Sequence, residues 1–174
     1  MGNEPNVKEL VKLFNHLFLD SENTRLEVGA EEPFYKAASE RTPAIIYSRA
    51  DFFSSALHEL AHWCIAGPER RKLDDFGYWY EPEGRTQKQQ IAFEKVEIKP
   101  QALEWLFSLA SNHVFNFSAD NLSQSAVASE TFKIAVRTQA KDYLEKGMPQ
   151  RARQLFNGLN EYYRQARTVE INDV

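Results

Sequence analysis

The chain has 174 residues, of which 43% are hydrophobic and 26% charged, so the composition excludes a disordered protein and suits one domain over residues 1–174. The net charge of −4 gives no general case for direct nucleic-acid binding. A single cysteine excludes an internal disulfide, and we find neither a signal peptide nor an apolar run of membrane-spanning length. We therefore expect a cytoplasmic protein without a membrane partner.

The first part of the chain predicts one helix followed by short strands. Apolar residues recur at helical spacing after Pro5, which predicts a helix over residues 5–18. Residues 24–29 and 43–48 have the composition of short strands, and residues 31–38 between them are a candidate third strand.

A second helix is predicted over about residues 51–65. Asp51 is a suitable N-cap for this helix, because its carboxylate can accept a hydrogen bond from the first turn. Gly67 and Pro68 stop it.

The second half of the chain is predicted to be mainly helical. Residues 76–85 are rich in aromatic residues and are a candidate edge strand. Residues 86–112 have a helical pattern, and Pro100 predicts a kink there or a boundary between two helices. Two more helices are expected over 129–146 and 149–166. This order of elements indicates an α+β fold, in which helices surround a small sheet.

The sequence His-Glu-x-x-His at residues 58–62 carries the clearest chemistry. His58 and His62 are four residues apart, so on a helix their imidazoles leave the same face one turn apart and can bind one divalent ion. Glu59 lies beside this pair, where the equivalent glutamate of zinc peptidases activates water.

A third ligand is expected, because catalytic ions commonly have three protein ligands and open positions. Glu94 and Glu97 are three residues apart on one face of the predicted helix, and either carboxylate could reach the ion. Two histidines and a carboxylate occur both in zinc hydrolases and in non-haem Fe(II) oxygenases. The residues alone therefore predict a metal site and leave the reaction open.

The remaining metal-binding residue types are weaker candidates. His16 lies among apolar residues of the first helix, His113 is in a predicted loop, and Cys64 is expected to be a buried, inert thiol. Residues 132–164 carry an excess of basic residues, which could dock an acidic partner or simply be solvated.

Three segments together resemble the bacterial elongation factor P hydroxylase family: "HELAHWCIAG", "DFGYWYEPEGR" and "FEKVEIKPQALEWLF". The resemblance covers roughly residues 23–123 and continues more weakly beyond them. It implies hydroxylation of the modified lysine of elongation factor P after β-lysine has been attached to it. It also implies a zincin-like or metal-dependent-ribonuclease-like core, and a 2-His-1-carboxylate site for iron that uses O₂ as co-substrate.

The resemblance assigns roles to individual residues. The ligands implied are His58, His62 and Glu97, with Glu94 as a supporting residue or an alternative ligand. Glu59 is the candidate catalytic residue, which orients a ligand or moves protons. We predict that the substrate contacts five residues, namely Tyr78, Trp79, Tyr80, Arg70 and Arg71.

Three other functions use the same residues. A zinc peptidase would use Glu59 as its general base, and the spacing of the motif alone favours this alternative. A metal-dependent nuclease and a non-enzymatic, metal-stabilised module are the others. The resemblance favours the hydroxylase.

Overall fold

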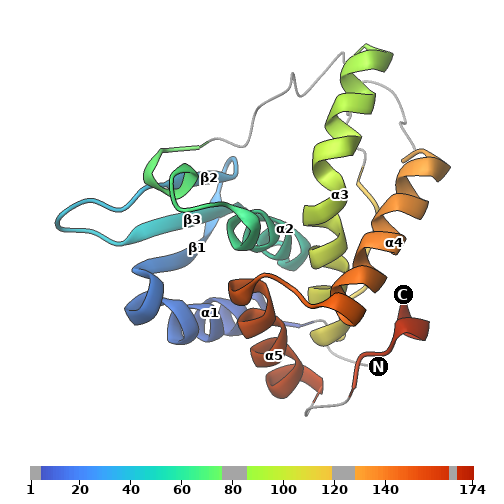
Figure 1. Cartoon of the computed structure of the whole chain (residues 1–174). Helices are drawn as coiled ribbons and strands as arrows, with labels where there is room; N and C mark the ends of the chain where they lie inside the picture. The colour runs from blue at the N-terminus through green and yellow to red at the C-terminus, as the bar shows by residue number, and fades with distance from the viewer. Residues whose placement is uncertain (1–4, 76–85, 119–127, 165–167) are drawn as a thin grey trace.

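The computed structural model describes residues 5–75, 86–118, 128–164 and 168–174, and confirms an α+β arrangement (Figure 1). The helices are α1 (Val7–Glu22), α2 (Phe53–Ile65), α3 (Gln87–Ala110), α4 (Glu130–Lys146) and α5 (Gln150–Arg164). The strands are β1 (Thr24–Ala30), β2 (Phe34–Lys36) and β3 (Ala44–Arg49), and short 3₁₀ helices span Arg70–Lys72 and Ile171–Asp173. The candidate strand at 76–85 lies outside the described residues.

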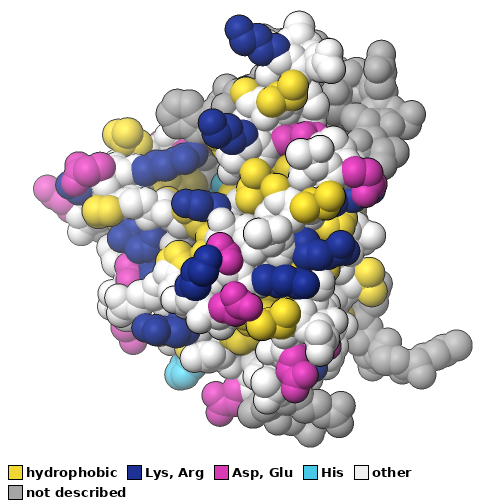
Figure 2. All heavy atoms as spheres, turned by 45° about the vertical axis from the view of Figure 1, so that its right-hand side comes forward, with side chains coloured by type: hydrophobic (Ala, Val, Ile, Leu, Met, Phe, Trp, Pro, Cys, Tyr) yellow, Lys and Arg dark blue, Asp and Glu magenta, His cyan; other side chains and the backbone are white. Residues whose placement is uncertain are grey.

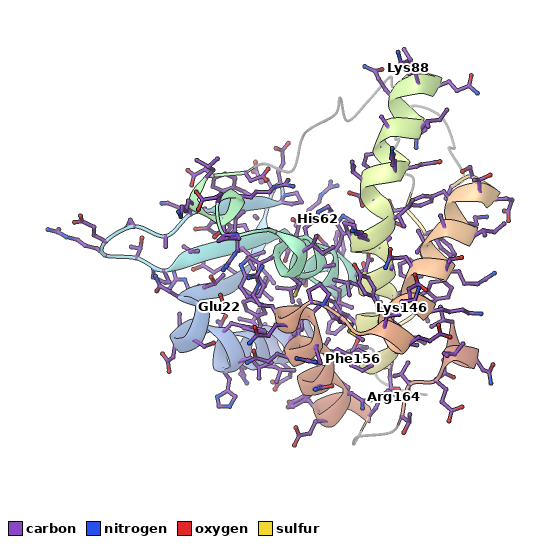
Figure 3. All side chains as sticks on the ribbon, viewed as in Figure 1. Glu22, His62, Lys88, Lys146, Phe156 and Arg164 are labelled. Carbon is purple, nitrogen blue, oxygen red and sulfur yellow. The ribbon has the colours of Figure 1, made fainter. Side chains whose placement is uncertain are left out.

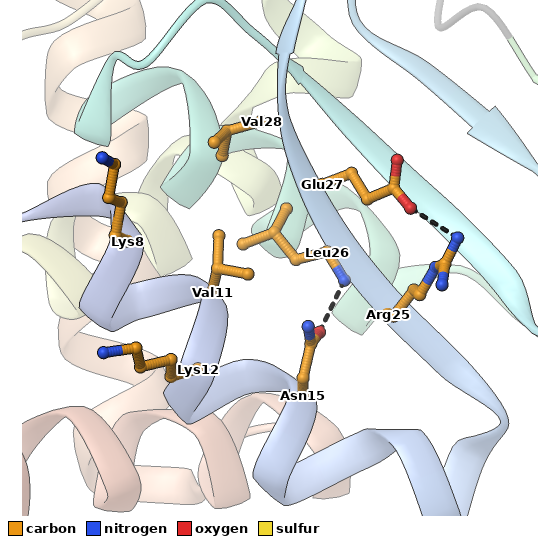
Figure 4. A pocket seen from close by; sticks show the side chains of 8 residues that line it. All are labelled: Lys8, Val11, Lys12, Asn15, Arg25, Leu26, Glu27 and Val28. Carbon is orange, nitrogen blue, oxygen red and sulfur yellow. Dashed lines mark hydrogen bonds and ion pairs between the residues drawn. The ribbon is translucent and has the colours of Figure 1, made fainter.

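The three strands form one sheet in the order β1-β3-β2. β1 runs parallel to β3, and β2 runs antiparallel to β3. In this register, Leu26 of β1 and Tyr35 of β2 are both paired with Ile46 of β3. Leu26 and Ile46 are buried in the core that the sheet shares with the helices. On the outer edge of β1, the backbone N–H of Leu26 donates to Oδ1 of Asn15 from α1 at 2.8 Å, beside a surface pocket (Figure 4).

Helix α1 is longer than predicted at its C-terminal end. Asn6 caps it by accepting a hydrogen bond from the N–H of Lys8, and Phe14 and Phe18 pack in the core. The helix ends at Glu22 because Asn23 takes the left-handed conformation, with φ of 47°. The apolar pattern thus located the helix, while the signal that ends it was overlooked.

Helix α2 lies where the motif predicted it, but its start differs. The N-cap is Phe52, which makes no side-chain capping bond, so the prediction that Asp51 caps the helix is wrong. The chain turns sharply at Ala50, with φ of 47°, and the Ser55 hydroxyl instead accepts a hydrogen bond from the N–H of Arg49 at the end of β3. The helix ends at Ile65, just before Gly67, as expected.

Helix α3 is one helix with Pro100 inside it, so a boundary between two helices at this proline is wrong. Pro100 cannot donate to the carbonyl of Val96, four residues earlier. Val96 lies at the surface, where water can replace that donor, and the turns after Pro100 are buried in the core on several sides. Thr86 and Gln89 form a capping box that fixes the start of the helix.

Helices α4 and α5 match the predicted segments closely and complete the core. α3 packs against α2, α4 and α5 (Figure 1). Figure 2, turned to bring the α3 and α4 side forward, shows Lys and Arg side chains spread among apolar and acidic ones. Part of the basic excess is paired internally, since Lys133 and Lys146 form ion pairs with Glu130 and Asp142.

None of the helices among the described residues is long and apolar enough to cross a membrane. The zincin-like or ribonuclease-like character of the core stays a prediction.

Candidate metal centre

Three side chains meet where α2 packs against α3. His58 and His62 come from α2 and Glu97 from α3, and one potential ligand atom of each lies within 4.8 Å of the others. Nε2 of His62 is 3.1 Å from Nε2 of His58 and 3.1 Å from Oε1 of Glu97. Nε2 of His58 is 3.6 Å from Oε2 of Glu97. The three groups thus point toward a common centre.

The two helices place this cluster at the edge of the core. Leu57, Leu60 and Ala61 of α2 are fully buried, so the helix turns its histidines along the border between core and surface. The His62 side chain is 37% exposed and that of Glu97 only 7%, so the cluster has a buried side and an accessible side. In Figure 3, His62 lies between α2 and α3.

The electrostatics of the cluster favour a cation. Burial opposes ionisation of Glu97, but the hydrogen bond of His62 and the charges of both histidines lower the pKa of this carboxyl to about 2. Burial likewise opposes a charge on His58, but the Glu104 and Glu97 carboxylates outweigh it and raise the pKa of His58 to about 10. The site therefore attracts and holds positive charge, here a proton.

Glu104 is a residue of the site that the sequence analysis missed. Its Oε2 is 2.7 Å from Nδ1 of His58, on the side of the ring away from the cluster. The signal was present in α3, where the buried polar side chains occur at helical spacing on one face: Glu97, Gln101, Glu104 and Ser108. Polar residues at such spacing in an apolar helix indicate a face of the helix on which buried polar side chains bind one another or a ligand.

The residues present fit a divalent metal ion. Within the part of the chain that the structure describes, Oε2 of Glu97 is buried without a hydrogen-bond partner. Such an atom calls for an unseen partner, and a carboxylate facing two imidazole nitrogens is a common donor set for Zn²⁺ or Fe²⁺. Metal binding by these residues stays a prediction.

Glu94 and Glu59 are close to the three grouped residues along the chain, and their side chains have different settings. Oε2 of Glu94 accepts a hydrogen bond from the Ser129 hydroxyl at 2.9 Å, and Glu94 is not among the three grouped side chains. Glu59 follows His58 on α2 and is half-buried. Burial raises the pKa of the Glu59 carboxyl, and the charges of His58 and His62 oppose this shift only in part.

The predicted substrate-binding residues are only partly described. Arg70 donates two hydrogen bonds to Oδ2 of Asp75, and Nη1 of Arg71 is 3.0 Å from Oε2 of Glu22. Both guanidinium groups therefore have intramolecular carboxylate partners, and their contact with a substrate stays a prediction. The aromatic run Tyr78, Trp79 and Tyr80 lies outside the described residues.

The other candidate ligands do not join the cluster. Cys64 is buried, as predicted, and burial raises the pKa of its thiol. The His113 ring packs against Phe53, with 5.1 Å between ring centroids, and His16 is exposed on α1.

Fold and site together define a class: an α+β protein with a candidate metal centre of two histidines and one carboxylate. Residues 13–173 match the sequence model of the family described as "Elongation factor P hydroxylase". The chain is 49% identical over 162 residues to the "Elongation factor P lysine hydroxylase" of Haemophilus influenzae, covering 92% of this chain and 90% of that relative. The chain belongs to the elongation factor P hydroxylase family, which confirms the resemblance seen in its sequence.

Proposed function

We propose that this protein hydroxylates the β-lysylated lysine of elongation factor P, as a monooxygenase that uses Fe(II) and O₂. The reaction and the protein substrate are proposed from the name of the relative from Haemophilus influenzae, to which this chain is 49% identical. The grouping of His58, His62 and Glu97 supports the metal. Because the substrate is a translation factor, we also propose that the protein acts in the cytoplasm.

In this proposal, His58, His62 and Glu97 hold the ion. Ferrous iron would supply the redox chemistry with O₂ that hydroxylation of a C–H bond requires and that zinc lacks. The side chain of His62 is the most exposed of the three, so the lysyl chain reaches the centre from that side of α2. The buried side, formed by Glu97 and the core of α3, excludes water.

Glu59 is the proposed proton carrier of the reaction. Its raised carboxyl pKa, which follows from burial, favours a group that can hold a proton close to the two histidines. Tyr78, Trp79 and Tyr80 remain the proposed walls of the lysyl channel, and Arg70 and Arg71 the proposed contacts with the protein substrate.

The test uses metal-free protein and β-lysylated elongation factor P. With ferrous iron and an excess of a two-electron reductant such as ascorbate in air, mass spectrometry should show the gain of one oxygen on the modified lysine. The second oxygen atom of O₂ leaves as water, and the reductant supplies the two electrons that this requires. With zinc, or with iron but no O₂, the mass should not change. His62→Ala should be inactive under all three conditions.

Modification that zinc supports without oxygen would refute this function. Cleavage of a peptide by the zinc-loaded protein, without any gain of oxygen, would instead favour the zinc peptidase.

A further inference from the structure

We propose that Glu104 is a positioning residue that holds the His58 ring with Nε2 directed at the metal. This inference rests on the proposed metal centre and adds a residue that contacts one of its ligands. It concerns a side chain that touches neither ion nor substrate and acts through His58 alone.

The contact between these residues is short and sheltered. Oε2 of Glu104 is 2.7 Å from Nδ1 of His58, and the Glu104 side chain is 9% exposed. A buried carboxylate loses its hydration and is tolerated only with a strong partner. The imidazole of His58 is such a partner, so the pair holds both side chains in one arrangement.

The direction of the contact decides which nitrogen can bind a metal. When Nδ1 carries the only proton of the ring and donates a hydrogen bond to the Glu104 carboxylate, Nε2 has a free lone pair. This nitrogen is the one that faces the cluster, 3.1 Å from Nε2 of His62 and 3.6 Å from Oε2 of Glu97. The carboxylate also makes the imidazole a stronger ligand, because it stabilises the positive charge that the ring gains on binding.

The two histidines differ in this respect. Over the residues with described positions, the recorded polar contacts of His62 run through Nε2, to His58 and Glu97. The side chain of His62 is also more exposed than that of His58. The ring of His58 is therefore the better fixed of the two, and Glu104 fixes it.

One helix thus supplies a ligand and a support for another ligand. Glu97 and Glu104 are seven residues apart on α3, about two helical turns, so they lie on the same face. His58 of α2 sits between them, facing Glu97 with one nitrogen and Glu104 with the other.

The test compares Zn²⁺ binding by Glu104→Gln and Glu104→Leu, measured by competition with a coloured chelator. Gln keeps the volume and an acceptor oxygen but loses the charge, whereas Leu removes the acceptor. We expect dissociation constants about 10-fold higher for Gln and about 100-fold higher for Leu, the range typical of residues that support a metal ligand. Glu22→Gln is the matched control, since it removes the charge of a paired carboxylate on α1 and should leave Zn²⁺ affinity unchanged.

A second readout follows the proton itself. In ¹⁵N-labelled, Zn²⁺-loaded protein, NMR should show the signal of the His58 Nδ1 proton in the parent and in Glu104→Gln. In Glu104→Leu this signal should disappear, because a proton without an acceptor exchanges with water. A purely structural role for Glu104 would change the unfolding temperature without this pattern. If Glu104→Leu fails to fold, Glu104→Gln still tests the inference by its weaker Zn²⁺ binding and retained proton.

Three results would overturn the proposal. If both Glu104 variants bind Zn²⁺ as tightly as the wild type while His58→Ala loses the ion, the role of Glu104 is refuted. The proposed metal centre is not affected by this result. Equal losses in the Gln and Leu variants would also refute positioning, because Gln retains the acceptor. Tight Zn²⁺ binding by His58→Ala would refute the metal centre and this inference together.

Discussion

Replacing Arg151 with alanine should lower the free energy of unfolding by about 2–3 kcal/mol and loosen the end of α2 that carries His62. Nη2 of Arg151, on α5, donates to the backbone carbonyls of Trp63, Cys64 and Ala66. These carbonyls belong to the C-terminal end of α2, where helical donors run out. The guanidinium carbon also lies 4.8 Å from the ring centroid of Trp63.

The magnitude follows from these contacts. A hydrogen bond at a part-buried site contributes about 1 kcal/mol net, and the two hydrogens on Nη2 limit the three contacts to about two full bonds, or about 2 kcal/mol together. The contact with the Trp63 ring adds about 0.5–1 kcal/mol. Burial, which lowers the pKa of Arg151 and leaves its Nε without a described partner, subtracts part of this. The net loss should lower the melting temperature by about 5–10 °C in a chain of this size.

Urea denaturation of the metal-free protein, followed by circular dichroism, measures the effect. Arg151→Lys is the matched control: it keeps the charge but has one small ammonium group, so it should recover roughly half of the loss. A Zn²⁺ titration of Arg151→Ala should show weaker binding, because His62 is in the last turn of α2. If the free energy of unfolding of Arg151→Ala lies within about 0.5 kcal/mol of that of the parent, the role of Arg151 in capping α2 is refuted.

Three further predictions concern the cluster itself. Zn²⁺ affinity should rise about tenfold per pH unit between about pH 7 and 9, because His58, with a pKa of about 10, must release a proton to bind; affinity that is constant with pH would contradict this. The metal-free protein should lose stability as the pH rises from about 6.5 toward 10, since a raised pKa stabilises the fold only while the group stays protonated; thermal melts along this range measure it. Glu97→Ala should abolish metal binding and Glu94→Ala should leave most of it, as measured by metal content after dialysis, and the reverse order would make Glu94 the ligand.

Local signals in the sequence located most of the helices and strands. The apolar spacing that predicted α1 reflects contacts that this helix makes along one face, and such spacing can be read without knowing the partner. The position of the His58–His62 pair was predictable for the same reason, because both residues lie on one helix.

Features that depend on a second element were not predictable in this way. Glu94 and Glu97 appeared equivalent, yet three residues of helix rotate the side chain by about 60°, which is enough to turn Glu94 toward Ser129 at the start of α4. The polar spacing on α3 marked Glu104 as a polar residue of a buried face, but its role depends on His58, which is 46 residues away along the chain. The error at Asp51 has a local cause, a turn at Ala50 that no residue preference announces.

The candidate ligands come from both sides of the interface between α2 and α3, so their grouping depends on how the two helices are aligned. A slide of α3 by one turn, about 5.4 Å, would bring Phe93 or Gln101 to the position that Glu97 now occupies. Neither side chain could replace the carboxylate, and His58 would lose Glu104 at the same time. The axial alignment of α2 and α3 therefore determines which side chains can act as ligands. A substitution in the apolar contact between the two helices could abolish metal binding without changing any polar residue.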